Sequence, residues 1–142
     1  CVMASEIDKY ANLAYETLYG HKTVGDITKV KAADVPNHDL LVAGVPCQPW
    51  SVAGKRKGFD DERGTMWSHV DRILKAKKPK AFIIENVKGL LSHNKGESFI
   101  EICENLSSIG YLIDFQVLNS KYFGVPQNRE RIYLIGIRED LV

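Results

Sequence analysis

The sequence lacks the features that mark membrane proteins, disulfide scaffolds and metalloproteins. Only three cysteines occur in 142 residues, and none forms a Cys-x-x-Cys pair. A disulfide framework is therefore unexpected, which favours a reducing compartment such as the cytoplasm. The four histidines are scattered and form no His-Glu-x-x-His pattern, so no metal site is expected. No apolar run approaches the roughly 20 residues of a transmembrane helix, and no signal peptide is recognisable.

Charge and length set the remaining limits. The formal net charge is +1, so any argument for a polyanionic partner must rest on local clusters. A chain of 142 residues suits one domain, which we place at residues 1–142. The first residue is Cys1 and not methionine, which we interpret as the start of a segment of a longer chain.

Hydrophobic periodicity predicts alternating strands and helices, and therefore an α/β domain with a mainly parallel sheet. The last two strands are joined by about a dozen residues without a helical pattern, which favours an antiparallel pair. Cys103 lies on an apolar helical stripe and is expected in the core. The lysines at 75, 77 and 78 suit a solvated helix end. We predict helices over 9–19, over 67–78, and from 99 to a cap at Gly110. We predict strands over 2–7, 23–27, 40–44, 81–84, 112–118 and 132–137.

Three kinds of reactive side chain are expected at one edge of this sheet. Cys47 follows the strand at 40–44, and Glu85 ends the next strand along the chain. Consecutive parallel strands are commonly neighbours, roughly 4.8 Å apart, and an antiparallel last strand would begin at the same edge with Arg129 and Arg131. Each residue has a simpler explanation: a buried thiol, a solvated acid, a surface ion pair. Their convergence favours a nucleophile, an acid and two guanidinium groups around one pocket.

Two further sets point to ligands. Glu6 and Asp26 lie near the ends of predicted strands, where acids commonly accept hydrogen bonds from ribose hydroxyls; helix capping by Asp8, with Glu6 merely exposed, is the alternative. The segment 54–59 (GKRKGF) places three cations between glycines. It suits a mobile lid that follows a phosphate backbone, or an ordinary basic loop.

Four segments, in this order and spacing, resemble the DNA cytosine-5 methyltransferases. Residues 44–51 (GVPCQPWS) resemble the family's Pro-Cys-Gln nucleophile motif, and residues 61–65 (DERGT) resemble the end of its catalytic loop. Residues 85–87 (ENV) resemble its Glu-Asn-Val motif, and residues 124–131 (GVPQNRER) resemble its Gln-x-Arg-x-Arg motif. The resemblance covers essentially the whole chain and implies a partial Rossmann-like, S-adenosylmethionine-dependent methyltransferase domain.

The resemblance implies transfer of a methyl group to carbon 5 of cytosine in double-stranded DNA. Cys47 would add to carbon 6, which makes carbon 5 nucleophilic. Glu85 would contact ring nitrogen 3 and the exocyclic amine, Arg131 the carbonyl oxygen, and Arg129 would lie beside it. The target base must leave the duplex, and the loop 46–65 would close over it. The DNA contacts implied are Gln48, Ser51, Lys55, Arg56 and Lys57.

The cofactor implied is S-adenosylmethionine. Glu6 would bind its ribose and Ile7 would pack on adenine, with Asp26 and Ile27 at the other edge. Pro46 and Met66 complete the implied cofactor set. The family's first strand, between 2–7 and 40–44, its cofactor glycine loop and its target-recognition region have no counterpart in the sequence. We therefore expect residues 1–142 alone to fold poorly, to bind the cofactor weakly and to be inactive. No membrane or metal partner is expected, and no oligomer is indicated.

Two other functions remain open. A related family member methylates cytosine in transfer RNA and shares the Pro-Cys-Gln and Glu-Asn-Val motifs, so these residues separate the two substrates poorly. A catalytically silent regulatory homologue need not keep the nucleophile, whereas Cys47, Glu85, Arg129 and Arg131 are all present. The resemblance favours the DNA enzyme, of prokaryotic or phage origin and typical of restriction-modification systems.

Overall fold

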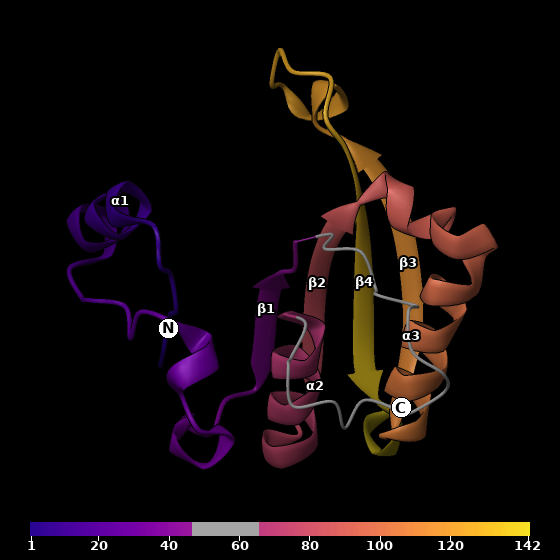
Figure 1. The fold of residues 1–142 in the computed structure, drawn as a ribbon, viewed down its shortest axis with the longest axis horizontal. Helices are drawn as coiled ribbons and strands as arrows, with labels where there is room; N and C mark the ends of the chain where they lie inside the picture. Colours follow the sequence, from indigo (N-terminus) through magenta and orange to yellow (C-terminus); the bar gives the residue numbers. More distant parts are fainter. Residues whose placement is uncertain (47–65) are drawn as a thin grey trace.

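A four-stranded sheet forms the centre of the computed structural model, which describes residues 1–46 and 66–142. Its strands are β1 (Leu40–Gly44), β2 (Ala81–Val87), β3 (Tyr111–Asn119) and β4 (Glu130–Arg138), in the order β1-β2-β4-β3 (Figure 1). β1 and β2 are parallel, and β4 is antiparallel to both β2 and β3. Three strands therefore share one direction and the last one opposes them, which confirms the predicted α/β fold.

Two amphipathic helices cover one face of this sheet. α2 (Met66–Lys77) precedes Pro79, which is consistent with a helix ending there, and α3 (Glu97–Ser108) is followed by Gly110 in a left-handed conformation, φ 92°. Their apolar stripes meet the inward side chains of β2 and β4 in a single core. The members of this core from the helices and the two strands are Trp67, Val70, Leu74, Phe82, Ile84, Ile102, Leu106, Ile132 and Leu134.

The core also explains one glycine in the sheet. Gly136 pairs with Phe82 across β4 and β2, and a Cβ at position 136 would lie 2.1 Å from a ring carbon of Phe82. That ring packs edge-on against Tyr111, with the ring centroids 5.1 Å apart. Position 136 therefore admits no side chain while Phe82 keeps this place.

The opposite face of the sheet carries apolar side chains in the alternate register. Val42 on β1 pairs with Ile83 on β2, which in turn pairs with Ile135 on β4. Val42 is 69% exposed and Ile135 is 46% exposed. Within the described residues, this face is less covered than the helical face, as the alternating burial of β2 and β4 shows.

The N-terminal region contains the helix α1 (Lys9–Tyr19), which lies to the side of β1 in Figure 1. The carboxylate of Asp8 caps it by accepting from the amides of Tyr10 and Ala11 at 2.9 and 2.8 Å, and Gly20 ends it with φ 74°. These are the predicted limits of the helix. None of its residues is buried.

Two strand predictions in the same region are wrong. Residues 2–7 and 23–27 form no strand, although the amide of Val24 donates to the carbonyl of Ala4 at 2.8 Å. A β ladder needs repeated pairing along both segments. Instead, Asp26 caps a short 3-10 helix, Ile27–Lys29, so local capping replaces pairing at the end of this segment.

Candidate active site

Glu85 and two arginines meet at the edge where β1 and β2 end and β4 begins. The Nε of Arg131 lies 2.9 Å from Oε1 of Glu85, and an Nη2 of Arg129 lies 4.0 Å from the same oxygen. The strand register explains this, because Val87 pairs with Arg131 and Glu85 pairs with Tyr133. Glu85 and Arg131 thus project from the same face, two positions apart. The structure brings these three predicted residues together.

The guanidinium of Arg131 is held on two sides. Its Nη1 donates to the carbonyl of Glu130 at 2.8 Å, while its Nε faces Glu85. The side chain of Arg131 is 21% exposed and that of Glu85 is 30% exposed, so both remain open to a ligand although they are paired. This arrangement of an acid and a guanidinium suits hydrogen bonding to the edge of a flat polar ring.

The end of β1 lies directly beside Glu85. Gly44 pairs with Glu85 across the parallel strands, and the amide of Val45 donates to the Glu85 carbonyl at 3.0 Å. Pro46, the last described residue here, is exposed. Cys47 follows it in the sequence and lies outside the described residues. So do the expected DNA contacts Gln48, Ser51, Lys55, Arg56 and Lys57.

The predicted cofactor acids are each held by nearby hydrogen bonds. Oε1 of Glu6 accepts from the amides of Ile7 and Asp8 at 2.8 and 2.9 Å. Oδ1 of Asp26 accepts from the amide and the hydroxyl of Thr28 at 2.9 and 2.7 Å. The hydroxyl of Thr28 and then its amide lower the pKa of Asp26. Asp8 caps α1, as the alternative explanation for this acidic segment expected.

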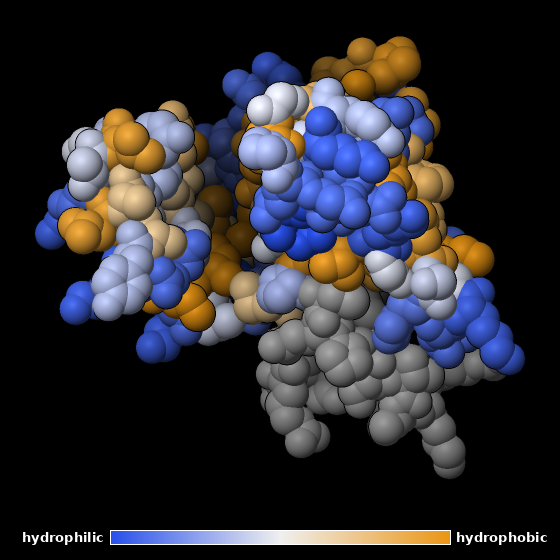
Figure 2. Space-filling view, turned by 90° about the horizontal axis from the view of Figure 1, so that it is seen from above, coloured by the Kyte–Doolittle hydropathy of each residue, from blue (hydrophilic) through white to orange (hydrophobic). Residues whose placement is uncertain are grey.

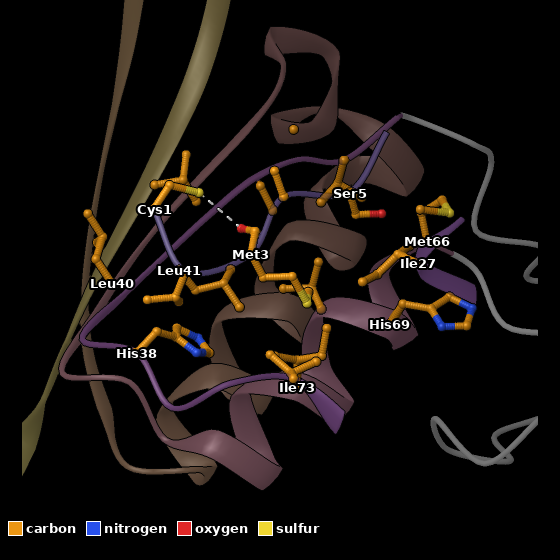
Figure 3. A pocket seen from close by; sticks show the side chains of 18 of the residues that line it. Cys1, Met3, Ser5, Ile27, His38, Leu40, Leu41, Met66, His69 and Ile73 are labelled. Atoms are coloured by element: carbon orange, nitrogen blue, oxygen red, sulfur yellow. Dashed lines mark hydrogen bonds between the residues drawn. The ribbon is translucent and has the colours of Figure 1, made fainter. Parts of the chain in front are cut away.

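A cavity of about 720 Å³ lies between the N-terminal segment, β1 and the start of α2. Its lining is mainly apolar and includes Ile27 and Met66, two of the predicted cofactor residues, together with Met3, Leu41 and Ile73 (Figure 3). In Figure 2 apolar residues show in the hollow between the N-terminal part and the sheet. Glu6, Ile7, Asp26 and Pro46 are not among the residues that line it.

His69 on α2 lines this cavity, and Arg72 on the same helix bonds both His69 and Ile27 of the lining; neither residue was predicted from the sequence. Nη2 of Arg72 donates to the carbonyl of Ile27 at 2.7 Å, and its Nε donates to Nδ1 of His69 at 3.0 Å. Burial and, to a smaller extent, the nearby Arg72 charge lower the pKa of His69. Their spacing of three residues on a helix is the sequence signal for this contact.

Two polar residues beside the arginines were also missed. Lys88 pairs with Glu130 at 3.1 Å, which links the segment after Glu85 to the start of β4. Asn119 is buried at the end of β3 and contacts the segment that carries Arg129. An asparagine just before a polar loop is a common turn signal, but its partners ten residues away are not visible in the sequence.

The described part of the chain has neither a candidate metal site nor a helix suited to cross a membrane. Among residues 1–46 and 66–142, no group of three or more His, Cys, Asp or Glu side chains is arranged to hold a metal ion. No helix in the same ranges has the length and apolar character that a bilayer crossing requires.

Comparison with known proteins identifies relatives of this chain. The chain is 51% identical over 140 residues to the type II methyltransferase M.HaeII of Haemophilus aegyptius, covering 99% of this chain and 44% of that protein. It is 51% identical over 141 residues to the orphan methyltransferase M.SPRI of Bacillus phage SPR, covering 97% of this chain and 32% of that protein. Among solved structures, the S. pombe Dnmt2 methyltransferase matches with a TM-score of 0.77 and 26% identity, over 98% of this chain and 43% of that one.

The chain therefore spans less than half the length of these relatives. A family profile described as C-5 cytosine-specific DNA methylase matches residues 1–142. Because that match extends over the whole sequence, and because the order of the motifs and the sheet agree with it, this chain belongs to the C-5 cytosine-specific DNA methylase family.

Proposed function

We propose that the complete protein transfers a methyl group from S-adenosylmethionine to carbon 5 of cytosine in double-stranded DNA. The observation that carries the proposal is the Glu85–Arg131 pair, 2.9 Å apart, beside the strand end that precedes Cys47. The family match supports the reaction class. Since DNA is the proposed substrate, we infer a cytoplasmic enzyme, of the kind found in restriction-modification systems.

In this proposal, the thiolate of Cys47 adds to carbon 6 of the flipped cytosine. Glu85 contacts nitrogen 3 and the exocyclic amine, and Arg131 donates to the carbonyl oxygen, with Arg129 beside it. The guanidinium of Arg131, and a proton shared between Glu85 and nitrogen 3, would stabilise the negative charge that the ring acquires on addition. Carbon 5 would then take the methyl group as the sulfonium–methyl bond of the cofactor breaks. The carbon 5 proton would pass to a base, and its electron pair would restore the ring double bond and expel Cys47 as the thiolate. The Glu85–Arg131 geometry favours this role because both groups are fixed before substrate arrives.

The residues near the N-terminus fit a cofactor with a ribose and a flat base. The carboxylates of Glu6 and Asp26 are each oriented through one oxygen by hydrogen bonds to nearby amides or hydroxyls. Ile27 and Met66 supply apolar surface on the cavity. When bound beside these residues, S-adenosylmethionine would supply the methyl group as an electrophile. The residues proposed to hold it are Glu6, Ile7, Asp26, Ile27, Pro46 and Met66.

The test traps the covalent step in the complete protein. DNA in which the target cytosine is 5-fluorocytosine cannot lose its carbon 5 substituent, so methyl transfer leaves protein and DNA joined. We expect a denaturation-resistant adduct with cofactor present, and none with Cys47→Ala. An adduct that persists in Cys47→Ala would remove this residue from the proposed role.

An RNA arm decides the substrate. Duplex DNA and transfer RNA of equal cytosine content, both carrying 5-fluorocytosine, are compared at equal concentration. Adduct formation with DNA is expected. Adduct formation with transfer RNA alone would replace the proposed substrate, and formation with neither would favour a catalytically silent homologue.

A further inference from the structure

We propose that Asn119 is a positioning residue that holds the arginine-bearing segment, residues 127–131, against the Glu85 site. This inference rests on the proposed function of Arg129 and Arg131. Asn119 ends β3 and pairs with Glu130, the first residue of β4, so it stands at the base of the loop that connects the two strands.

Both the nitrogen and the oxygen of the Asn119 side-chain amide form hydrogen bonds with this loop. Its Nδ2 donates to Oδ1 of Asn128 at 2.6 Å. Its Oδ1 accepts from the amides of Lys121 and Arg129, each at 3.2 Å. Asn119 is only 8% exposed, and a buried hydrogen-bonding group that loses its partners is costly. One side chain therefore joins the start of the loop to the residue that carries the first guanidinium.

The loop is exposed, and polar contacts hold it to the end of the sheet. Residues 121–130 are all exposed, and the loop extends beyond the sheet in Figure 1. Its other fixed contacts are also polar: the amide of Ser120 donates to the carbonyl of Arg129 at 3.1 Å, and the hydroxyl of Ser120 donates to the carbonyl of Gln127 at 2.6 Å. Next to Arg129, Glu130 pairs with Lys88 at 3.1 Å. The backbone of Arg129 itself is held at its amide by Asn119 and at its carbonyl by Ser120.

The consequence concerns the orientation of the two guanidinium groups. Arg131 reaches Glu85 at 2.9 Å, whereas Arg129 lies at 4.0 Å from the same carboxylate. Arg131 is already inside β4, so ladder hydrogen bonds hold its backbone. Arg129 precedes the strand, and its backbone is held by Asn119 and Ser120. Loss of Asn119 is therefore expected to loosen Arg129 more than Arg131.

The experiment compares Asn119→Ala with Asn119→Asp in the complete protein. Asp keeps an oxygen for the amides of Lys121 and Arg129, and the side-chain amide of Asn128 can rotate to donate to it. We expect Asn119→Ala to slow adduct formation with 5-fluorocytosine DNA by about tenfold to a hundredfold, the range of a lost buried hydrogen bond. Asn119→Asp is expected to stay within about threefold of the wild type.

Asn105→Ala is the matched control. Asn105 is a partly buried asparagine on α3 that donates to Asp71 at 2.7 Å, far along the chain from the arginines. All variants are assayed well below their melting temperatures. Asn105→Ala should lower the melting temperature and leave the adduct rate unchanged. Equal slowing by Asn105→Ala and Asn119→Ala would show a general loss of stability and would overturn the inference.

A second measurement does not depend on activity. Hydrogen exchange at the Arg129 amide should accelerate in Asn119→Ala, return toward the wild-type rate in Asn119→Asp, and not change in Asn105→Ala. Unchanged exchange in Asn119→Ala would overturn the positioning role even if the enzyme were slower. If the wild type forms no adduct while the exchange pattern appears as expected, the proposed function fails and the structural positioning by Asn119 stands.

Discussion

The helices α1 and α2 differ in burial far more than in sequence pattern. They have 11 and 12 residues, and both have amphipathic periodicity. α2 buries Trp67, Val70, Asp71, Ile73 and Leu74, whereas α1 buries none of its residues. A helical pattern therefore predicted that both helices form, but not whether each one packs.

The difference arises from what each helix lies against. The apolar side chains of α2 belong to the core that also contains Phe82 of β2 and Leu134 of β4, both fully buried. α1 is held by local bonds, such as the Asp8 cap and the hydrogen bonds from Asn12 to the carbonyls of Glu6 and Asp8. Capping fixes where a helix begins, while packing supplies most of its stability. We expect the N-terminal region to open locally well before the sheet unfolds.

The largest expected effect separates Leu74 on α2 from Leu13 on α1. Leu74 has 0% exposure and Leu13 has 64%. Leu74→Ala leaves a cavity among core side chains and should cost about 2–5 kcal/mol, whereas Leu13→Ala should change the free energy of unfolding by less than about 0.5 kcal/mol. Urea denaturation of both variants measures this. A large cost for Leu13→Ala would show that Leu13 is packed against another part of the protein.

A smaller effect is expected to separate Asp71 on α2 from Glu16 on α1. Asp71 on α2 is buried, and its carboxylate accepts from Lys75 and from Asn105 on α3, both at 2.7 Å. Asp71→Ala removes the polar link between the two helices and should cost about 1–3 kcal/mol.

Glu16 on α1 is exposed, so Glu16→Ala is the control for loss of a carboxylate and should be nearly neutral. The midpoints of thermal unfolding compare the two. Equal midpoints for both variants would mean that the Asp71 link contributes nothing to the packing of α2 against α3.

The smallest expected effect is a pH dependence from Tyr111. This side chain is 2% exposed and its hydroxyl donates to the carbonyl of Pro79 at 2.7 Å. Burial raises the pKa of Tyr111 above its usual value of 10.0. Because the folded state holds this proton more tightly, the related stability is present below that value and is lost as pH rises through the folded pKa.

The wild type should therefore lose thermal stability more steeply above about pH 10 than Tyr111→Phe. Tyr10→Phe, at an exposed position on α1, is the control and should keep the wild-type slope. Parallel curves for wild type and Tyr111→Phe would show that the tyrosine proton is not linked to folding.

Much of the sheet and part of the site could be predicted from local rules. The apolar run at 40–44, the longer one that begins at Ala81, and the helix-free connection before β4 predicted both the parallel pair and the antiparallel last strand. Since strand ends meet at one edge, the same rules placed Glu85 near Arg131. Residues 2–7 have the composition of a strand but form none. A strand needs a neighbour to pair with, and composition alone does not say whether one is available.

The roles of Asn119 and Arg72 were not predictable in the same way. The sequence suggests only a turn at Asn119. The chain returns at β4, and this return brings the amide of Arg129 to the side chain of Asn119. Arg72 reads as a solvated helix residue, and only the packing of α2 brings it to the carbonyl of Ile27. The sequence settles the parallel β1–β2 pair, the antiparallel β3–β4 pair and the residue types at a strand end, because these depend on segments that follow one another along the chain. Contacts such as these depend on distant segments, so the fold alone establishes which polar side chains hold the site in place.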